Sequence, residues 1–188
     1  MRVFLHIAPY MRNRDQYIKD IFSFLAVAKS RGVHIIPVLF DDCWKETWND
    51  GQQPDPVPGL HNSQWVQCPG KVEIDEAILK NYVVDIIGSF RNSETIVMWD
   101  LYNEVGNSGK LVGSLPFCMK VFSWARSASP SQPVTSGWWN GDVAFDPINE
   151  FILNESDVIT FHAYCDIECT KTQINKLRSR DISLFRTQ

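Results

Sequence analysis

The sequence predicts an α/β fold built on a parallel sheet that is buried on both faces. Short apolar runs of strand length alternate along the chain with longer segments whose apolar residues recur at helical spacing. The strand-like runs are apolar throughout, as expected for strands that helices cover on both faces. The 188 residues are enough to bury a substantial core. Since no shift of composition marks a boundary, we expect residues 1–188 to form a single domain.

Five strands are expected, and each is a continuous run of apolar and β-branched residues. They cover residues 2–7, 33–40, 95–102, 133–137 and 157–161. Helices are expected over residues 16–30, 74–90, 116–128 and around 173–177. The segment 41–70 is rich in Pro, Gly, Asn and Trp and has no periodicity, and loops of this length inside compact domains are usually functional.

The order of these elements fits either an open doubly wound sheet or an arc of a barrel. A doubly wound sheet that binds nucleotides carries a glycine-rich phosphate loop after its first strand. Here Ala8, Pro9 and Tyr10 occupy that turn. The sequence therefore argues against a nucleotide-binding sheet and leaves the two architectures open.

Composition excludes several classes of function. The formal net charge of -4 is spread along the chain, unlike the basic surface of a nucleic-acid-binding protein. No apolar run is long enough to span a bilayer, and the first residues lack the pattern of a cleavable secretory signal. Aromatic residues make up 12% of the chain, with seven Trp, which suits either stacking on sugar rings or core packing.

The five cysteines are scattered and odd in number, which argues against a closed disulfide framework. Cys165 and Cys169 either pair with each other or, with His162, form part of a metal site. No second ligand pair of matching spacing supports the metal, so we expect neither a metal nor a cofactor. The cysteine content does not indicate the cellular compartment of the protein.

Polar and aromatic residues collect after the predicted strands, whose bodies stay apolar. Ligand sites of parallel α/β folds lie at these carboxyl ends of the strands, so the asymmetry predicts an enzyme. In strand order the residues are His6; Asp41, Asp42 and Trp44; Asn103 and Glu104; Trp138 and Trp139; and His162 and Tyr164.

Glu104 directly follows the buried run TIVMWDLY. Partial burial at a strand end raises the pKa of a carboxyl group, which predicts a general acid at neutral pH. The alternative is a solvated loop glutamate that caps a local turn, and the polar residues around Glu104 favour the acid. Asn103 either binds a sugar hydroxyl next to the reacting carbon or shapes the turn.

His162 and Tyr164 lie two residues apart, so they either share one side of the strand end or are buried aromatics satisfied by the backbone. Asp41 and Asp42 are adjacent and point to opposite faces, so one of them is expected to be structural. Asp100 lies inside a strand and is interpreted as a hydrogen-bond partner for a neighbouring strand. The loop 61–65 (HNSQW) forms either the rim of a sugar site or a loop that packs its own Trp.

Several of these segments together resemble the retaining glycoside hydrolases of clan A, the cellulase-like and 1,4-β-xylanase-like (β/α)8 barrels. WDLYNE, ending at Glu104, looks like the Asn-Glu signature that closes the fourth barrel strand. FHAY, ending at Tyr164, looks like the sixth strand, and RVF, beginning at Arg2, is similar to the second. PVLFDDCW and HNSQWV add to the likeness, which extends to about Leu177.

By this resemblance Glu104 is the catalytic acid/base and Asn103 binds the 2-hydroxyl of the substrate. The other residues expected to bind an oligo- or polysaccharide are Arg2, His6, Trp44, Trp65, Trp139, His162 and Tyr164. Trp44 and Trp65 are expected to be the stacking platforms. Family members are often secreted or periplasmic.

The chain also departs from the family pattern. The family's first strand would precede Arg2, and its nucleophile is a Glu that ends the seventh strand, but no Glu follows Glu168 here. We therefore expect a partial TIM (β/α)8 barrel with strands 2–6 present, strands 1, 7 and 8 missing, and activity lost with the nucleophile. Its open sheet edges favour self-association.

Three alternatives remain beside this hydrolase. The first is a carbohydrate-binding remnant without catalysis. A barrel lyase or aldolase would need a Schiff-base Lys or a metal cluster at the strand ends, and neither is found. The third is a structural fragment without a ligand.

Overall fold

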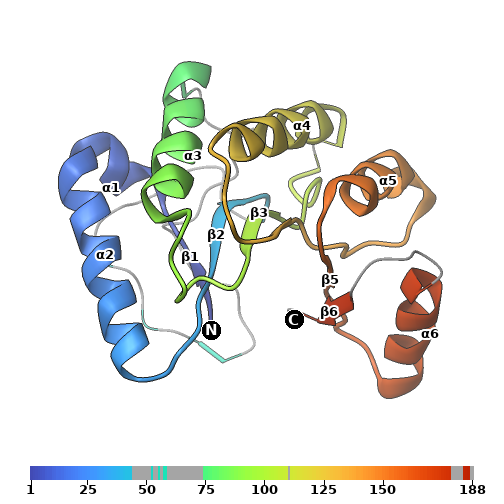
Figure 1. The fold of residues 1–188 in the computed structure, drawn as a ribbon. Helices are drawn as coiled ribbons and strands as arrows, with labels where there is room; N and C mark the ends of the chain where they lie inside the picture. Colours follow the sequence, from blue (N-terminus) through green and yellow to red (C-terminus); the bar gives the residue numbers. More distant parts are fainter. Residues whose placement is uncertain are drawn as a thin grey trace.

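The computed structural model of the chain, drawn in Figure 1, describes residues 1–43, 52, 55, 57–58, 74–109, 111–178 and 184–186. The two predicted stacking residues, Trp44 and Trp65, lie outside the described residues, as does the loop 61–65. Among the described residues, no helix is both long and apolar enough to cross a membrane.

Six short parallel strands of the described residues follow one another side by side. They are β1 (Arg2–Phe4), β2 (Ile36–Asp41), β3 (Trp99–Asn103), β4 (Val134–Thr135), β5 (Ile159–Phe161) and β6 (Leu184–Arg186). The first four form one sheet in the order β1-β2-β3-β4, and β5 pairs with β6. A parallel bridge between Trp138 and Phe161 joins the two parts just beyond β4.

Because each strand lies beside the next one in the chain, the strand order never reverses. A doubly wound sheet reverses its order at the switch point where ligands bind, whereas a barrel does not. Figure 1 shows the helices along the outside of the strands, from α1 and α2 past α3 and α4 to α5 and α6. Of the two architectures that the sequence left open, the structure has the arc of a barrel.

In the described part of the chain, six α-helices cover the outside of this arc. They are α1 (Ile7–Arg12), α2 (Arg14–Ser30), α3 (Glu76–Phe90), α4 (Leu111–Ser127), α5 (Asp146–Glu155) and α6 (Ile167–Arg178). The core lies between helices and strands, where Tyr82 and Ile86 of α3 and Trp99 and Leu101 of β3 are fully buried. Burial of such side chains is the main favourable contribution to the stability of the fold.

The first strand is shorter than predicted, because a helix begins where the strand was expected to end. His6 is the N-cap of α1, and its Nδ1 accepts a hydrogen bond from the backbone N–H of Ala8 at 2.9 Å. Pro9 falls in the first turn of α1, where a backbone N–H has no helical partner and proline is tolerated. The prediction of a strand over residues 2–7 was therefore wrong beyond Phe4.

Three further elements differ from the prediction. Helix α4 begins at Leu111 and contains Pro116, which we expected to start it. Helix α5 was not predicted, although Pro147 near its start and buried Ile148 and Ile152 are typical of a helix. Strand β6 is a sixth strand where five were expected, and it pairs in parallel with β5.

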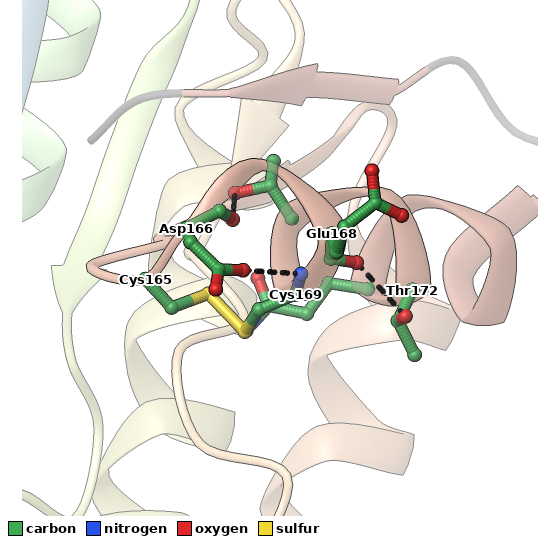
Figure 2. Close-up of a disulfide and its surroundings, with 7 residues drawn as sticks. Cys165, Asp166, Glu168, Cys169 and Thr172 are labelled. Carbon is green, nitrogen blue, oxygen red and sulfur yellow. Dashed lines mark hydrogen bonds between the residues drawn. A yellow bond between two sulfur atoms is a disulfide. The ribbon is translucent and has the colours of Figure 1, made fainter.

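Cys165 and Cys169 form a disulfide at the start of α6, with their Cα atoms 5.9 Å apart (Figure 2). Asp166 lies between them in sequence, and its carboxylate accepts a hydrogen bond from the backbone N–H of Cys169 at 2.9 Å. Of the two readings that the sequence left open for these cysteines, pairing is the one the structure shows.

Candidate active site

Glu104 lies in the turn that follows β3, at the carboxyl end of the strand. Its φ of 48° is in the left-handed region, which only two non-glycine residues adopt in the described part of the chain. For a side-chain-bearing residue this backbone costs about 1–2 kcal/mol, and such strain often persists at functional sites. Only 6% of Glu104 is exposed.

Four side chains surround the Glu104 carboxylate. His162 Nδ1 lies 2.9 Å from Oε1, and the hydroxyl of Tyr164 donates to the same oxygen at 3.4 Å. The Sγ of Cys43 and the Nδ2 of Asn107 donate to Oε2 at 2.9 and 2.7 Å. Cys43 follows β2 and His162 follows β5, so the ends of three strands meet at one carboxylate.

These contacts change the protonation of Glu104 in the direction opposite to the prediction. Burial acts to raise the pKa of the carboxyl group, but the hydrogen bonds from His162, Cys43 and Asn107, together with the charge of His162, outweigh it and lower the pKa to about 2. The sequence had predicted a raised pKa from burial alone. At neutral pH Glu104 is therefore ionised, and a carboxylate is the form that acts as a base.

His162 is buried, and the room for its ring depends on a glycine. A Cβ atom at Gly137 would lie 2.8 Å from His162 Nε2, well inside van der Waals contact. The same Nε2 is buried and has no hydrogen-bond partner among the described residues. Nδ1, which faces the carboxylate, therefore carries a proton and donates it in the hydrogen bond to Glu104.

We expect Gly137→Ala to displace the His162 ring and weaken its hydrogen bond to Glu104. The pKa of Glu104 then rises from about 2 toward its ordinary value of 4.5, because one of the donors that stabilise the carboxylate is lost. Carboxyl ¹³C NMR across an acid titration measures this change. Gly88→Ala, at a position in α3 with open space around it, is the matched control and leaves the pKa unchanged. An unchanged pKa in Gly137→Ala would contradict this role of the glycine.

Asn103 is held from both sides at the end of β3. Its Oδ1 accepts from Arg2 Nη2 at 2.6 Å, and its Nδ2 donates to Asp41 Oδ1 at 2.5 Å. Arg2 also donates to Asp100 Oδ2 through Nε at 3.0 Å and Nη2 at 2.7 Å, so the partner of Asp100 comes from β1, beyond the neighbouring strand β2 that was expected to supply it. Arg2 thus contacts Asn103 rather than Glu104, and it fixes which way the amide of Asn103 points.

The two adjacent aspartates have separate surroundings. Asp42 Oδ2 accepts hydrogen bonds from the backbone N–H of Gly106 and the hydroxyl of Ser114, both at 2.6 Å, so Asp42 holds the turn after Glu104 in place. Asp41 contacts Asn103 instead, and burial raises the pKa of its carboxyl group to about 7. Asp42 is thus the structural member of the pair.

Gly106, in the turn held by Asp42, has φ of 88°, and a Cβ there would lie 2.6 Å from Leu111 Cδ2. We expect Gly106→Ala to lower the free energy of unfolding by about 2–4 kcal/mol, because backbone strain and overpacking add. Gly109 has φ of 76° but open space around it, so Gly109→Ala isolates the backbone part, about 1–2 kcal/mol. Urea denaturation of both variants measures the difference, and equal losses would rule out the steric part.

The other two described candidates lie next to the cluster rather than in it. His6 caps α1, and burial lowers the pKa of its imidazole to about 4. The indole N–H of Trp139 donates to the backbone oxygen of Val105 at 3.0 Å, and its ring packs edge-on against Phe145. Trp139 therefore covers the turn beside Glu104. Substrate contact by these two residues stays a prediction.

Sequence reasoning missed two residues of this cluster, Cys43 and Asn107. Cys43 was set aside as one of several scattered cysteines, but it lies two residues beyond Asp41. Side chains alternate along an extended chain, and this alternation was the signal that places Cys43 on the same side as Asp41. Asn107 lies three residues after Glu104 in a tight turn, a spacing at which side chains meet.

Among the described residues, no group of three or more metal-ligating side chains forms a metal site.

Comparison with known proteins gives structural likeness alone. No protein-family model matches the chain, and no curated protein matches it in sequence. The structure is similar to Bacteroides uniformis β-glucuronidase 2 covalently bound to cyclophellitol-6-carboxylate aziridine, with a TM-score of 0.55 and 10% identity over 86% of this chain. A second structure of a Bacteroides uniformis β-glucuronidase matches with a TM-score of 0.54 and 10% identity over 86% of this chain.

The chain spans 18% of the length of each β-glucuronidase chain. A weaker likeness, with a TM-score of 0.47 and 14% identity, links 85% of this chain to 54% of a psychrophilic glycoside hydrolase family 10 endo-β-1,4-xylanase. At these identities the likeness shows the fold alone. The chain has part of the TIM-barrel-like α/β fold found in glycoside hydrolase structures.

Proposed function

We propose that this chain carries the acid/base part of a retaining glycoside hydrolase site that acts on a β-linked glycan. The observation that carries the proposal is the buried Glu104 carboxylate, which four donors from three strand ends hold in place. Strands β1 to β5 then correspond to strands 2–6 of the family barrel, and β6 takes the next place in the arc. The proposed catalytic domain comprises residues 1–188, and its proposed partner is an oligo- or polysaccharide.

In this proposal Glu104 first gives a proton to the glycosidic oxygen as the bond to the sugar carbon breaks. It then removes a proton from the water that releases the sugar. His162 and Tyr164 hold Oε1, and Arg2 orients Asn103 toward the 2-hydroxyl. A retaining enzyme also needs a second carboxylate about 5–5.5 Å away as the nucleophile, and we propose that it comes from outside the described residues.

The low pKa of Glu104 must rise before it can act as the acid. A second carboxylate brought close to Glu104 disfavours its ionised form through like-charge repulsion and raises its pKa. With its low pKa Glu104 is ionised, as the base step requires. The charge of the nucleophile raises this pKa, so that Glu104 can be protonated for the acid step. Without that charge the site binds glycan and does not cleave it. The low pKa therefore also supports a second candidate function, non-catalytic glycan binding.

Dinitrophenyl β-glycosides, with and without azide, test the proposal on the wild type and on Glu104→Gln. The dinitrophenolate leaving group needs little help from an acid, so the assay isolates the nucleophile. If a nucleophile is present, the wild type releases sugar without azide, and Glu104→Gln with azide gives the β-glycosyl azide by two displacements. If it is absent, azide attacks the β-glycoside directly and gives the α-glycosyl azide.

Either azide product supports a sugar-cleaving site, and its configuration reports whether a second carboxylate takes part. If a folded protein binds oligosaccharide but forms no product, the result would contradict the hydrolase and support non-catalytic glycan binding. Absence of both binding and product would contradict both candidates.

A further inference from the structure

A buried thiol lies at the centre of the contacts around Glu104. Cys43 Sγ is 2.9 Å from Glu104 Oε2, and Asn107 Nδ2 donates to Sγ at 3.3 Å and to the same Oε2 at 2.7 Å. On its other side Sγ is 3.6 Å from Asn103 Nδ2. The thiol thus contacts both residues of the Asn-Glu pair, although it comes from the end of a different strand, β2.

The surroundings keep this thiol protonated, so it acts as a donor. Cys43 is 2% exposed, and burial, together with the negative charges of Asp41 and Glu104, raises the pKa of the thiol far above its ordinary range. The carboxylates of Asp41 and Glu104 both lie beside the thiol, and the 2.9 Å contact places its single S–H on Glu104 Oε2. A thiol in such surroundings is a poor nucleophile, which excludes a covalent role for Cys43.

The two oxygens of Glu104 have different surroundings. Oε2 is held by buried Cys43 and by Asn107 of its own turn. Oε1 is held by His162 and by Tyr164, and 76% of Tyr164 is exposed. Each oxygen thus has one buried partner and one partly exposed partner, and the thiol of Cys43 is the buried partner of Oε2.

We infer that Cys43 is a positioning residue for Glu104, whose buried thiol holds Oε2 and thereby fixes the orientation of the carboxylate. The inference rests on the proposed acid/base role of Glu104. The titratable groups around the carboxylate are Asp41 and Cys43 from the end of β2 and His162 and Tyr164 from the end of β5, and the charge of Arg2 in β1 acts on Tyr164. Removing the thiol leaves Oε2 with Asn107 alone and shifts Glu104 toward its protonated form.

The test is a carboxyl ¹³C NMR titration of the ¹³C-labelled chain, with the Glu104 resonance assigned by its loss in Glu104→Gln. Cys43→Ala is expected to raise the pKa of Glu104 by about one, because one of four donors is removed. Cys43→Ser keeps a donor and is expected to retain the wild-type pKa or a lower one. The control is Cys118→Ala, which removes the other buried free thiol of the described residues, located in α4, and leaves the pKa unchanged.

An unchanged pKa of Glu104 in folded Cys43→Ala would overturn the inference. A pKa of Glu104 that is as high in Cys43→Ser as in Cys43→Ala would overturn it as well. If Cys43→Ala does not fold, Cys43→Ser compared with the wild type carries the test, and a pKa raised by about one in the serine variant would overturn it. These readings do not depend on turnover. Loss of every glycosidase product would therefore overturn the proposed function and leave the NMR result standing.

On phenyl β-glycosides with azide, whose leaving group needs a general acid, the same variants separate positioning from structure. The limb of the pH–rate profile that reports Glu104 is expected to move in Cys43→Ala by the change found by NMR, and to stay in place in Cys118→Ala. A rate that falls equally at all pH values would show that the thiol only supports packing, and would contradict the inference.

Discussion

Arg2→Met is expected to lower the free energy of unfolding by about 3–5 kcal/mol, since it leaves a buried carboxylate without its partner. The side chain of Asp100 is fully buried and that of Arg2 is 10% exposed, and the two lie 2.7 Å apart. Water cannot replace the lost guanidinium, so the penalty of burying the Asp100 charge is no longer offset. Urea denaturation followed by tryptophan fluorescence measures the loss.

The matched control for this pair is Lys29→Met. It breaks an ion pair with Glu94 at 3.2 Å whose side chains are 67% and 85% exposed. An exposed pair of this kind contributes about 0–1 kcal/mol, so the control is expected to change little. A double replacement, Arg2→Met with Asp100→Leu, removes both charges and should recover much of the loss. If Arg2→Met costs no more than Lys29→Met, the buried ion pair does not stabilise the arc of strands.

Glu104→Gln is expected to lower the rate on phenyl β-glycosides by about 10²–10⁴-fold, the usual contribution of a general acid. Bond cleavage in dinitrophenyl glycosides loses far less, because their leaving group departs without a proton. Comparing the two leaving groups at saturating azide measures the difference. Glu155→Gln, an exposed carboxyl group at the end of α5, is the control and leaves both rates unchanged.

A uniform loss on both classes of substrate would contradict the acid role of Glu104. That result would instead indicate that the carboxylate binds sugar in the ground state, as in the non-catalytic candidate function. The loss expected for phenyl glycosides corresponds to about 2.7–5.5 kcal/mol of transition-state stabilisation. This is several times the contribution of one ordinary hydrogen bond, so the two readings are separable.

The fold was predictable where the sequence carries long or continuous signals. The strands β2 and β3 lie in long, mainly apolar runs, and α2 and α3 repeat apolar residues at helical spacing. Elements with short signals were not predictable, because neighbours stabilise them. Strand β6 has three residues and pairs with β5, and α1 depends on a histidine cap rather than on a Ser, Thr, Asp or Asn.

The cluster itself was partly predictable from the rule that parallel strands place their ends together. Glu104, His162 and Tyr164 were named from that rule and now lie in contact. The charge of Glu104 was not predictable, because burial and hydrogen bonding act on it in opposite directions. The outcome depends on Cys43 and Asn107, whose contacts only the folded chain shows.

We expect the strand-end cluster around Glu104 to bind sugar. An NMR titration of the isotope-labelled chain with cello-oligosaccharides, xylo-oligosaccharides and an aryl β-glucuronide tests this binding. At least one of these saccharides is expected to shift the Glu104 carboxyl resonance and those of the His162 and Tyr164 rings, with weaker binding to Glu104→Gln and unchanged binding to Glu155→Gln. Shifts confined to other surfaces, or no shift with any β-linked saccharide in a folded chain, would contradict it.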